Sequence, residues 1–325
     1  MAQTILLTGS AGFIGSHLLR WILNQSKAHV ISIDCLSYAS NTDTIADLLR
    51  HPRHQFVEGN ICDASLVNAL AEKCTGTLHL AAESHVDRSI QSAAPFIQSN
   101  VVGTQVLLDA AVHHKHERFL YVSTDEVYGA LTENGVFKET DPLAPSSPYS
   151  ASKAAADLMV NAWHHTYGLP TVVTRCTNNL GSHQHPEKFV PRLILNALHN
   201  LPLPIYGHGN HVRDWIDVRD HVRAIWWAYT EAPAGETLNI GANQERSNLQ
   251  IANHILELLP DSHSQITHIS DRPGHDFRYA NETSRLEAIS NWRPAYDLNE
   301  SLYDAVQWYK EHPKWWKHRW NEYTE

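Results

Sequence analysis

Cysteine is scarce in this sequence, and its few copies are widely spaced. The 325 residues include four, Cys35, Cys62, Cys74 and Cys176, and no two of them have Cys-x-x-Cys spacing. This pattern excludes the disulfide framework of small secreted domains and offers no zinc site. We therefore expect four reduced, buried thiols in a protein of a reducing compartment, with a cytoplasmic location.

Long apolar runs are also missing. No stretch approaches the ~20 apolar residues that a transmembrane helix needs, and MAQTILLTGSAGFIG has no basic segment before its short apolar run. Positive charge is in deficit, with 25 Lys and Arg against 35 Asp and Glu. These features argue against a membrane or a nucleic acid as partner. The 23 histidines are scattered, without companion ligands at metal-site spacing, so no metal site is predicted.

The first half of the chain alternates short apolar runs with helical patterns. The apolar runs predict strands at TILLTG, HVISID, HQFVEGN, GTLHLAA, RFLYVST and LPTVVTRCT. Apolar residues at helical spacing predict helices at about residues 13–23, 42–50, 94–114 and 150–167. This rhythm is typical of a parallel sheet covered by helices on both faces.

The rhythm stops after about residue 178, where prolines and short elements follow. Helical patterns return near residues 250–259 and 298–309. We predict an α/β protein of Rossmann type, with a doubly wound parallel sheet in residues 1–177. A smaller C-terminal α/β substrate lobe is expected in residues 178–325, interleaved with the first. The aromatic and basic ending KWWKHRW is interpreted as a terminal helix that packs its Trp side chains on the body of the protein.

A glycine-rich loop joins the first strand to the first helix. LLTGSAGFIGSH places Gly9, Gly12 and Gly15 at this junction, where a tight turn and a helix N-terminus suit a pyrophosphate. Asp34 ends the next strand, where a carboxylate accepts hydrogen bonds from ribose hydroxyls and repels a 2′-phosphate. The pattern predicts NAD rather than NADP as cofactor. Asp34 as an ordinary turn residue is the alternative.

Tyr149 and Lys153 stand four residues apart in PSSPYSASKAAAD. At the start of a helix, this spacing places both side chains on one face. A phenol with a pKa of about 10 is a poor base at neutral pH, but a neighbouring ammonium lowers that value. The pair also occurs often by chance. It indicates catalysis here because a dinucleotide loop precedes it.

Two adjacent acids follow the fifth predicted strand in FLYVSTDEVYG. Asp125 and Glu126 come directly after Ser123 and Thr124. If the strand ends near Thr124, both carboxylates lie on the turn at the edge where open α/β sheets bind ligands. Two acids held close in such a pocket separate their pKa values, so that one is protonated and one ionised. The alternative is a helix-capping box without catalytic meaning.

These motifs carry a resemblance. TGSAGFIG, STDEVYG and SPYSASK resemble the extended short-chain dehydrogenase/reductase family, and within it the nucleotide-sugar 4,6-dehydratases. Further stretches agree along nearly the whole chain: AAESHVDRSI, LAPSSPYSASKAAAD, NN, PEKFVPRLILNAL, LPIYGHGNHVRDWIDVRDH, GETLNIG and DRPGHDFRYA. Most epimerases, decarboxylases and reductases of the wider family lack the TDE signature.

The resemblance implies a hydro-lyase with tightly bound NAD that is regenerated in each turnover, and dTDP-glucose as the expected substrate. Tyr149, with its pKa lowered by Lys153, takes the proton of the sugar 4-hydroxyl while Thr124 holds the 4-oxygen. The new 4-keto group acidifies the C5 proton. Glu126 then removes that proton, Asp125 protonates the leaving 6-hydroxyl, and a 4-keto-6-deoxy sugar results.

The resemblance also implies binding residues. The cofactor set, besides the glycines, Asp34, Tyr149 and Lys153, comprises Phe13, Ile14, Asp63, Ala81, Ala82 and Ser84. The substrate set, with Ser84 and Thr124, comprises Asn178, Lys188, Arg213, Asn248, Arg272 and His275. Arginine suits bidentate contact with a diphosphate. A homodimer is expected through helices at 92–115 and 150–167.

Some residues depart from the family pattern. Leu180 and Ser182 replace the usual Tyr and Pro on a loop expected near the substrate, Asn60 replaces Asp, and Cys35 follows Asp34 where Lys is common. The departures leave a UDP- or CDP-linked sugar, or a different dehydration regiochemistry, open. A 4-epimerase, which has no need of Glu126, and a non-catalytic NAD-binding regulator are the other hypotheses.

Overall fold

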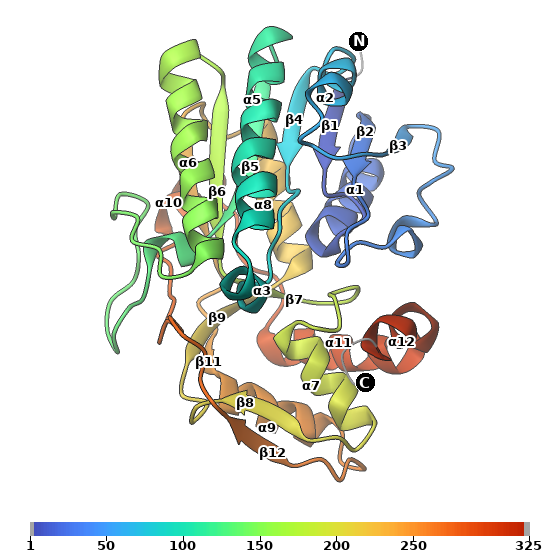
Figure 1. Cartoon of the computed structure of the whole chain (residues 1–325), viewed down its shortest axis with the longest axis vertical. Helices are drawn as coiled ribbons and strands as arrows, with labels where there is room; N and C mark the ends of the chain where they lie inside the picture. The colour runs from blue at the N-terminus through green and yellow to red at the C-terminus, as the bar shows by residue number, and fades with distance from the viewer. Residues whose placement is uncertain (1–2, 322–325) are drawn as a thin grey trace.

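The computed structural model describes residues 3–321, and its larger region is built on a seven-stranded parallel sheet (Figure 1). The strand order is β10-β6-β5-β4-β1-β2-β3. The strands are β1 (Thr4–Thr8), β2 (His29–Asp34), β3 (His54–Glu58), β4 (Gly76–His79), β5 (Arg118–Thr124), β6 (Thr171–Cys176) and β10 (Glu236–Ile240). All six neighbouring pairs are parallel, which confirms the predicted sheet.

Helices cover both faces of this sheet, as the doubly wound prediction requires. The first face carries α1 (Phe13–Gln25), α8 (Val218–Thr230) and α10 (Ser284–Ser290). The second face carries α2 (Ala64–Ala71), α5 (Gly103–His113) and α6 (Pro148–Tyr167). Figure 1 shows α5 and α6 running side by side along the sheet.

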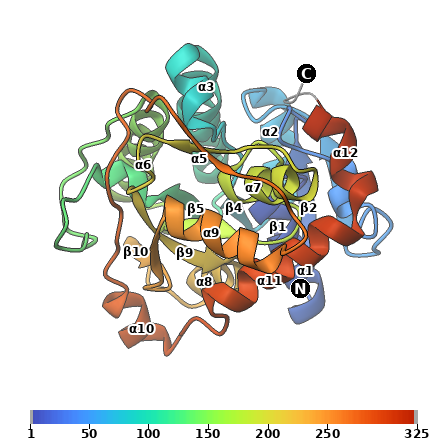
Figure 2. The same ribbon diagram turned by 90° about the horizontal axis from the view of Figure 1, so that it is seen from below.

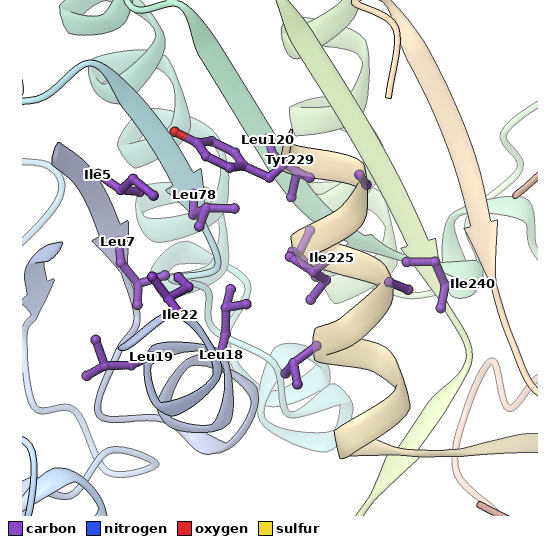
Figure 3. Packing of buried hydrophobic residues seen from close by; sticks show 14 of the residues in the cluster. Ile5, Leu7, Leu18, Leu19, Ile22, Leu78, Leu120, Ile225, Tyr229 and Ile240 are labelled. Carbon is purple, nitrogen blue, oxygen red and sulfur yellow. The ribbon is translucent and has the colours of Figure 1, made fainter. Parts of the chain in front are cut away.

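Successive side chains of a strand enter different cores, because they point to opposite faces of the sheet. Leu7 of β1 joins the core under α1 and α8, whereas its neighbour Leu6 joins the core under α2, α5 and α6. Figure 3 shows Ile22 of α1 and Ile225 of α8 on either side of the first core, close to Leu78 of β4. Strands buried on both faces explain why the sequence shows continuous apolar runs rather than alternation.

The smaller region lies at the carboxyl edge of the sheet. Its strands are β7 (Asn178–Leu180), β9 (Val212–Asp217) and β11 (Glu245–Ser247) in one sheet, with β8 (Leu203–Tyr206) and β12 (Ile266–Ile269) paired in another. Its helices are α7 (Phe189–Leu198), α9 (Asn248–Leu258), α11 (Leu298–Glu311) and α12 (Pro313–Asn321). Figure 2, seen from below, shows α7, α9 and α11 grouped together and α12 following α11. They share one apolar core.

The chain passes between the two regions more than once. After β7 and α7 it returns to the large sheet, where α8 packs on the first face and β10 pairs with β6. The sequence analysis assigned no element to α2, α7, α8 or β10. In α8 the apolar side chains lie at helical spacing and Asp217 caps the first turn, accepting a hydrogen bond from the Arg219 backbone N–H, so the signal was present.

Two predicted helices differ in detail. Residues 42–50 form a 3₁₀ turn, η1 (Thr42–Ile45), followed by turns instead of an α-helix. The Leu48 backbone N–H donates to the Ile45 carbonyl, a 3₁₀-type bond, and the Thr44 carbonyl instead accepts from Arg20. The segment at 94–114 is α4 (Ala94–Phe96), a π-helical stretch η2 (Ile97–Val102) and α5. Such stretches are frequent at functional sites.

The carboxyl-terminal helix confirms one interpretation and the cysteines correct another. Trp315 and Trp316 of α12 are buried, and the Trp315 indole donates to the Thr44 hydroxyl at 3.1 Å. All four cysteines are free thiols, but Cys35 is exposed and Cys62 half-buried, so the expectation of four buried thiols is wrong for these two. Among residues 3–321, no helix combines the length and apolarity needed to cross a bilayer.

Candidate active site

A cavity of about 490 Å³ opens at the carboxyl ends of the parallel strands. Its wall takes residues from β2, β5, β6 and β7, from the loops directly after β1, β3 and β4, and from the start of α6. Short helical elements complete it: α4 contributes Pro95, η2 contributes Gln98 and Ser99, and η3 (Asp125–Tyr128), which follows β5, contributes its first two residues. The helix α3 (Val86–Gln91), which follows the loop after β4, does not line the cavity. The cavity thus lies at the edge where open α/β sheets bind ligands.

The glycine loop is packed too tightly for side chains at two of its three glycines. A Cβ at Gly15 would lie 2.0 Å from the Gly9 carbonyl oxygen. Gly9 has φ +75°, and a Cβ there would lie 2.8 Å from the backbone nitrogen of Ala81. Gly12 is the N-cap of α1 without a side-chain capping bond, so the helix N-terminus faces the cavity with free N–H groups.

Asp34 ends β2 and ties the glycine loop to the next turn. Its carboxylate accepts hydrogen bonds at 3.0 Å from the backbone N–H groups of Ala11 and Leu36. The group is 5% exposed and lines the cavity. Burial raises its pKa, while these backbone hydrogen bonds act in the opposite direction. Asp34 is therefore a turn residue and a cavity residue at once.

The acid pair has the local geometry that the catalytic hypothesis needs. β5 ends at Thr124, and Asp125 and Glu126 form the first turn of η3. The Thr124 hydroxyl accepts from the Glu126 backbone N–H at 3.3 Å and donates to Asp125 Oδ1 at 3.3 Å. Thr124 is thus an N-cap, as the alternative interpretation held, but both acids also line the cavity. A cap and a catalytic pair are compatible here.

The surroundings of the two acids differ. Burial and the neighbouring Glu126 raise the pKa of Asp125 well above its usual value. Burial also raises the pKa of Glu126, but Arg272, Arg213 and Lys188 oppose that rise. Asp125 Oδ2 is buried and has no hydrogen-bond partner among the described residues. The site therefore favours a protonated Asp125 beside an ionised Glu126.

Tyr149 lies in the first turn of α6, positioned by a capping box between Ser147 and Ser150. The phenol is 8% exposed and lines the cavity with Thr124. Burial, with Glu126 next, raises its pKa well above the usual value, and the Thr124 hydroxyl opposes the rise. The expectation that Lys153 lowers this pKa is not met in the protein alone, since the two acids and burial dominate.

Lys153 lies one turn further along α6, inside the cavity wall. Its ammonium donates to the Val122 carbonyl at 2.8 Å and lies 4.2 Å from the centroid of the Tyr121 ring. Burial lowers its pKa to about 8, and the carboxylate of Asp157 opposes that shift. The ammonium is thus held by the backbone of β5, the strand that ends at Thr124, and by the face of the Tyr121 ring.

Four of the predicted substrate residues line the cavity: Ser84, Thr124, Asn178 and Lys188. Lys188, at the N-cap of α7, donates to the Ser84 carbonyl at 2.8 Å and lies 3.3 Å from its hydroxyl. This contact joins the smaller region to the loop after β4. Burial lowers the pKa of Lys188, while Glu187 and Glu126 favour its charged form.

The other four predicted substrate residues form a second group beside the cavity, outside its wall: Arg213, Asn248, Arg272 and His275. Arg213 of β9 donates to the carbonyls of Val212, at 2.7 Å, and Asp276, at 3.0 Å. Arg272 pairs with Asp87 of α3 at 3.3 Å. Their charges act on Glu126, which places this group on the side of the cavity where the acids lie.

Asn248 and His275 both contact His211. The Asn248 backbone N–H donates to the His211 carbonyl at 2.9 Å, and the rings of His211 and His275 stack with centroids 3.6 Å apart. Burial, with the Arg272 guanidinium, lowers the pKa of His275 to about 4, so the ring is neutral at neutral pH. Residues from β9, α9 and the loop after β12, which are distant in the chain, thus lie next to one another.

The residues predicted to bind the cofactor line the cavity, with one exception. Phe13, Ile14, Ala81 and Ala82 line it, as do the three glycines. Asp63 does not: its carboxylate caps α2, accepting from the Leu66 backbone N–H at 3.0 Å. The lining residues of that segment are instead Asn60, Ile61 and Cys62. The Asp63 prediction is therefore corrected, because helix capping already uses its side chain.

Several cavity residues were missed: Ser37, Ser40, Glu83, Gln98, Ser99, Asn179, Gln184 and His185. Gln98 and Ser99 reach the cavity from the π-helical stretch. Asn100 in the same stretch accepts from the Glu83 backbone N–H at 2.8 Å and donates to the Ser152 hydroxyl at 2.9 Å. No pattern in the sequence marks a π-helical turn, whereas the polar NN motif could have indicated Asn179.

Two departures from the family pattern lie away from the cavity. Leu180 is fully buried in the core of the smaller region, and the Ser182 carbonyl lies 3.0 Å from Nε2 of His17. Neither lines the cavity, although Asn178, Asn179, Gln184 and His185 of the same segment do, so the loop lies at the cavity while these two side chains point elsewhere. Cys35 and Asn60 do line it, close to Asp34.

Known proteins resemble this chain along most of its length. A model of the GDP-mannose 4,6 dehydratase family matches residues 6–305. The dTDP-glucose 4,6-dehydratase of Neisseria meningitidis serogroup B is 44% identical over 338 aligned residues, which cover 97% of this chain and 95% of the relative. The chain belongs to the nucleotide-sugar 4,6-dehydratases. This confirms the resemblance inferred from TGSAGFIG, STDEVYG and SPYSASK.

Solved structures of nucleotide-sugar enzymes share the fold. The dTDP-glucose 4,6-dehydratase of Streptomyces venezuelae, crystallised with NAD, superimposes with a TM-score of 0.94 at 41% identity, covering 97% of this chain and 99% of that one. The UDP-glucuronic acid 4-epimerase of Bacillus cereus gives 0.89 at 28% identity, covering 95% and 99%. The scaffold is thus common to dehydratases and epimerases, and the site must distinguish them.

Proposed function

We propose that this chain dehydrates a nucleoside-diphosphate sugar, dTDP-glucose, to the 4-keto-6-deoxy sugar with bound NAD. The observation that carries the proposal is the acid pair. Asp125 and Glu126 lie in one cavity with Tyr149, and their surroundings favour one protonated and one ionised carboxyl group. An oxidation site alone has no use for such a pair. A water elimination needs both an acid and a base.

The glycine loop and Asp34 fit a dinucleotide. Side chains at Gly9 or Gly15 would collide with backbone atoms, so the loop backbone is bare on the cavity side. The α1 N-terminus would receive the pyrophosphate, and the Asp34 carboxylate the adenosine ribose. NAD, when bound, supplies the hydride acceptor that the oxidation and the later return of the hydride require.

Tyr149 is the proposed base for the sugar 4-hydroxyl, and Thr124 the residue that positions the 4-oxygen. Both line the cavity, and the Thr124 hydroxyl acts to lower the pKa of the phenol against the effect of burial. The Lys153 ammonium donates to the Val122 carbonyl near this end of β5. We propose that Lys153 also donates to the nicotinamide ribose.

Glu126 is the proposed base for the C5 proton and Asp125 the acid for the leaving 6-hydroxyl. Oxidation at C4 must come first, because the keto group stabilises the negative charge that develops when C5 loses its proton. Arg272, Arg213 and Lys188 favour the ionised form of Glu126. Asp125, 2% exposed and with one oxygen unpartnered among the described residues, is suited to keep a proton until the hydroxyl leaves.

The two regions of the chain are proposed to divide the binding work. Residues of the large sheet are proposed to hold the cofactor. Residues of the smaller region are proposed to hold the nucleotide end of the substrate. Arg213, Asn248, Arg272 and His275 would contact the diphosphate, ribose or base. Arginine forks suit phosphate oxygens, and both arginines are already oriented by neighbouring oxygens.

The test is a comparison of substrates with product analysis. The purified protein, with its bound cofactor, is incubated with dTDP-, UDP- and CDP-glucose. We expect the mass of dTDP-glucose to fall by one water and the product to absorb strongly in alkali. Turnover of UDP- or CDP-glucose at a higher kcat/KM would reassign the nucleotide. An isomer of unchanged mass would instead identify a 4-epimerase, as in the Bacillus cereus relative of similar fold.

We further propose a cytoplasmic homodimer. The four free thiols are in keeping with a reducing compartment. Leu158 and Tyr167 on α6 and Ile97 on the π-helical stretch are exposed by 61%, 58% and 54% of their surface, which leaves apolar area on the helices expected to pair. Light scattering of wild type and Leu158→Glu tests the dimer, which the variant should dissociate.

A further inference from the structure

Three potential metal ligands converge beside the proposed nucleotide-binding group. They are His211, directly before β9, and Asp271 and His275 in the loop after β12. One ligand atom from each lies within 4.8 Å of the other two. No metal site was predicted from the sequence, where His211 precedes Asp271 by 60 positions and only the fold brings them together.

The backbone holds the two segments together. The Val212 N–H donates to the Phe277 carbonyl at 2.9 Å, and the Tyr279 N–H donates to the Val212 carbonyl at 3.3 Å. These bonds fix the positions of His211 and His275 relative to each other. Two of the three side chains therefore lie next to paired backbone, whereas Asp271 lies in the loop that leads to it.

The side chains point at one carboxylate. Nε2 of His211 lies 3.3 Å from Asp271 Oδ2, and Nδ1 of His275 lies 2.7 Å from Asp271 Oδ1. The two rings are stacked with an interplanar angle of 15°. Nδ1 of His211 is buried and has no hydrogen-bond partner within residues 3–321, so no protein group fixes the tautomer of that ring from the other side.

These contact distances can be compared with the distances between the ligand atoms of a tetrahedral ion. With bonds of about 2.0–2.1 Å to nitrogen and oxygen, two ligands of tetrahedral zinc are ~3.3 Å apart. The His211 contact, to Oδ2 of Asp271, already has this length, and the His275 contact, to Oδ1, is ~0.6 Å shorter. One ligand atom from each of the three residues lies within 4.8 Å of the others, so the side chains would close in by up to ~1.5 Å around an ion. Asp271, with 42% of its side chain exposed, has room for that movement. Two imidazoles and one carboxylate leave a position open for water.

We propose that His211, Asp271 and His275 form a binding site for a borderline divalent transition-metal ion such as Zn²⁺. This donor set favours Zn²⁺, Co²⁺ or Ni²⁺ over Mg²⁺ or Ca²⁺, which require mainly oxygen ligands. Arg272 lies next in the chain and opposes a cation, but it is paired with Asp87. Asp271 supplies the negative charge that faces the ion.

The ion would affect substrate binding, a consequence that rests on the proposed function. His275 and Arg272 belong to the proposed nucleotide group, so an ion on His275 removes one of its contacts. Zn²⁺ should then raise the KM for the nucleotide sugar and leave kcat within twofold, because the acids and Tyr149 line the cavity and the ion ligands do not. Activity without added zinc tests the proposed function separately.

The experiment uses Co²⁺ as an optical probe on the chelator-treated protein with its cofactor. We expect one Co²⁺ per chain with visible absorption of a tetrahedral or five-coordinate site, displaced by one equivalent of Zn²⁺. His211→Gln should weaken Co²⁺ binding at least tenfold. The matched control is His208→Gln, an exposed histidine three residues earlier, which should change binding less than twofold.

Asp271→Asn provides a second variant whose exposed position leaves folding intact, and it should also weaken binding at least tenfold. The proposal is overturned if the wild type shows no saturable absorption. It is equally overturned if His211→Gln and Asp271→Asn bind Co²⁺ as the wild type does, since the ion would then lie on other histidines. A Zn²⁺ effect on KM that persists in His211→Gln would contradict the link to substrate.

Discussion

The cofactor end and the nucleotide end of the site are built in different ways. At the cofactor end, the residues stand at the ends of strands of one sheet or at the start of a helix that covers it: Gly9 follows β1, Asp34 and Thr124 end β2 and β5, and Tyr149 begins α6. At the nucleotide end, Arg213, Asn248 and Arg272 come from three segments joined by backbone hydrogen bonds such as Val212–Phe277 and Asn248–His211. Changes at the first end should therefore affect chemistry or cofactor, and changes at the second end should affect substrate affinity.

Glu126→Gln should have the largest effect on catalysis of the changes at the cofactor end. The amide keeps the shape of the side chain but cannot accept the C5 proton, and we expect kcat to fall by about a hundred- to ten-thousandfold. Steady-state product formation from dTDP-glucose measures this loss. Glu133→Gln, on an exposed loop outside the cavity wall, is the matched control and should retain wild-type kcat.

Gly15→Ala should destabilise the protein and release the cofactor. The new Cβ would lie 2.0 Å from the Gly9 carbonyl oxygen, so the loop must move. We expect several kcal/mol of destabilisation, in the range of overpacking and strain at a closed backbone site. Gly12→Ala, whose Cβ would lie at an ordinary 3.4 Å from the same oxygen, should cost about 1 kcal/mol or less. Thermal unfolding and the NAD content of both purified variants measure the two effects. Equal losses of stability and of NAD in the two variants would contradict the packing argument.

Arg272→Gln tests the nucleotide end. Loss of one charged contact to a diphosphate should raise KM about tenfold, which is ~1.4 kcal/mol, with kcat within a few-fold. Arg246→Gln, an exposed arginine on β11, should leave both constants unchanged. If kcat fell a hundredfold while KM stayed constant, the separation of the two ends would be wrong.

Asp125→Asn should stabilise the protein at neutral pH. The folded protein holds the pKa of Asp125 well above its usual value, so the unfolded chain binds fewer protons at pH 7 and folding loses free energy as pH rises above the unfolded pKa. An amide removes that cost, and we expect a gain of about 1 kcal/mol at pH 7 that disappears near pH 3. Urea unfolding at both pH values measures it. A gain of equal size at pH 3 would exclude titration as the cause.

The same contrast explains what the sequence could predict. Strands buried on both faces leave continuous apolar runs, and the glycine loop and the acid pair are contiguous, so the sheet and most of the cavity wall were predictable. Two features failed for local reasons. Asp63 was predicted to bind the cofactor but caps α2, and residues 42–50 have helical spacing but form a 3₁₀ turn followed by further turns.

Other features depend on contacts distant in the chain. The seventh strand, β10, pairs with β6 across about 60 residues of chain, and no periodicity in the sequence indicates that the chain returns to the large sheet. Leu180 was expected near the substrate but is a core residue, because β7 pairs with β9 and turns its side chain inward. The raised pKa of Tyr149 likewise comes from burial and Glu126 together, which only the folded structure combines.

The central claim is that Asp125 and Glu126 serve the loss of water, whereas the scaffold of Tyr149 and Lys153 serves the oxidation. Rapid mixing of Glu126→Gln with dTDP-glucose tests it most directly, with cofactor reduction followed by absorbance and water loss by mass. We predict that the bound cofactor becomes reduced at a rate near that of the wild type, while the mass of the sugar nucleotide stays unchanged. Water loss at the wild-type rate, or no cofactor reduction at all, would contradict this division of roles.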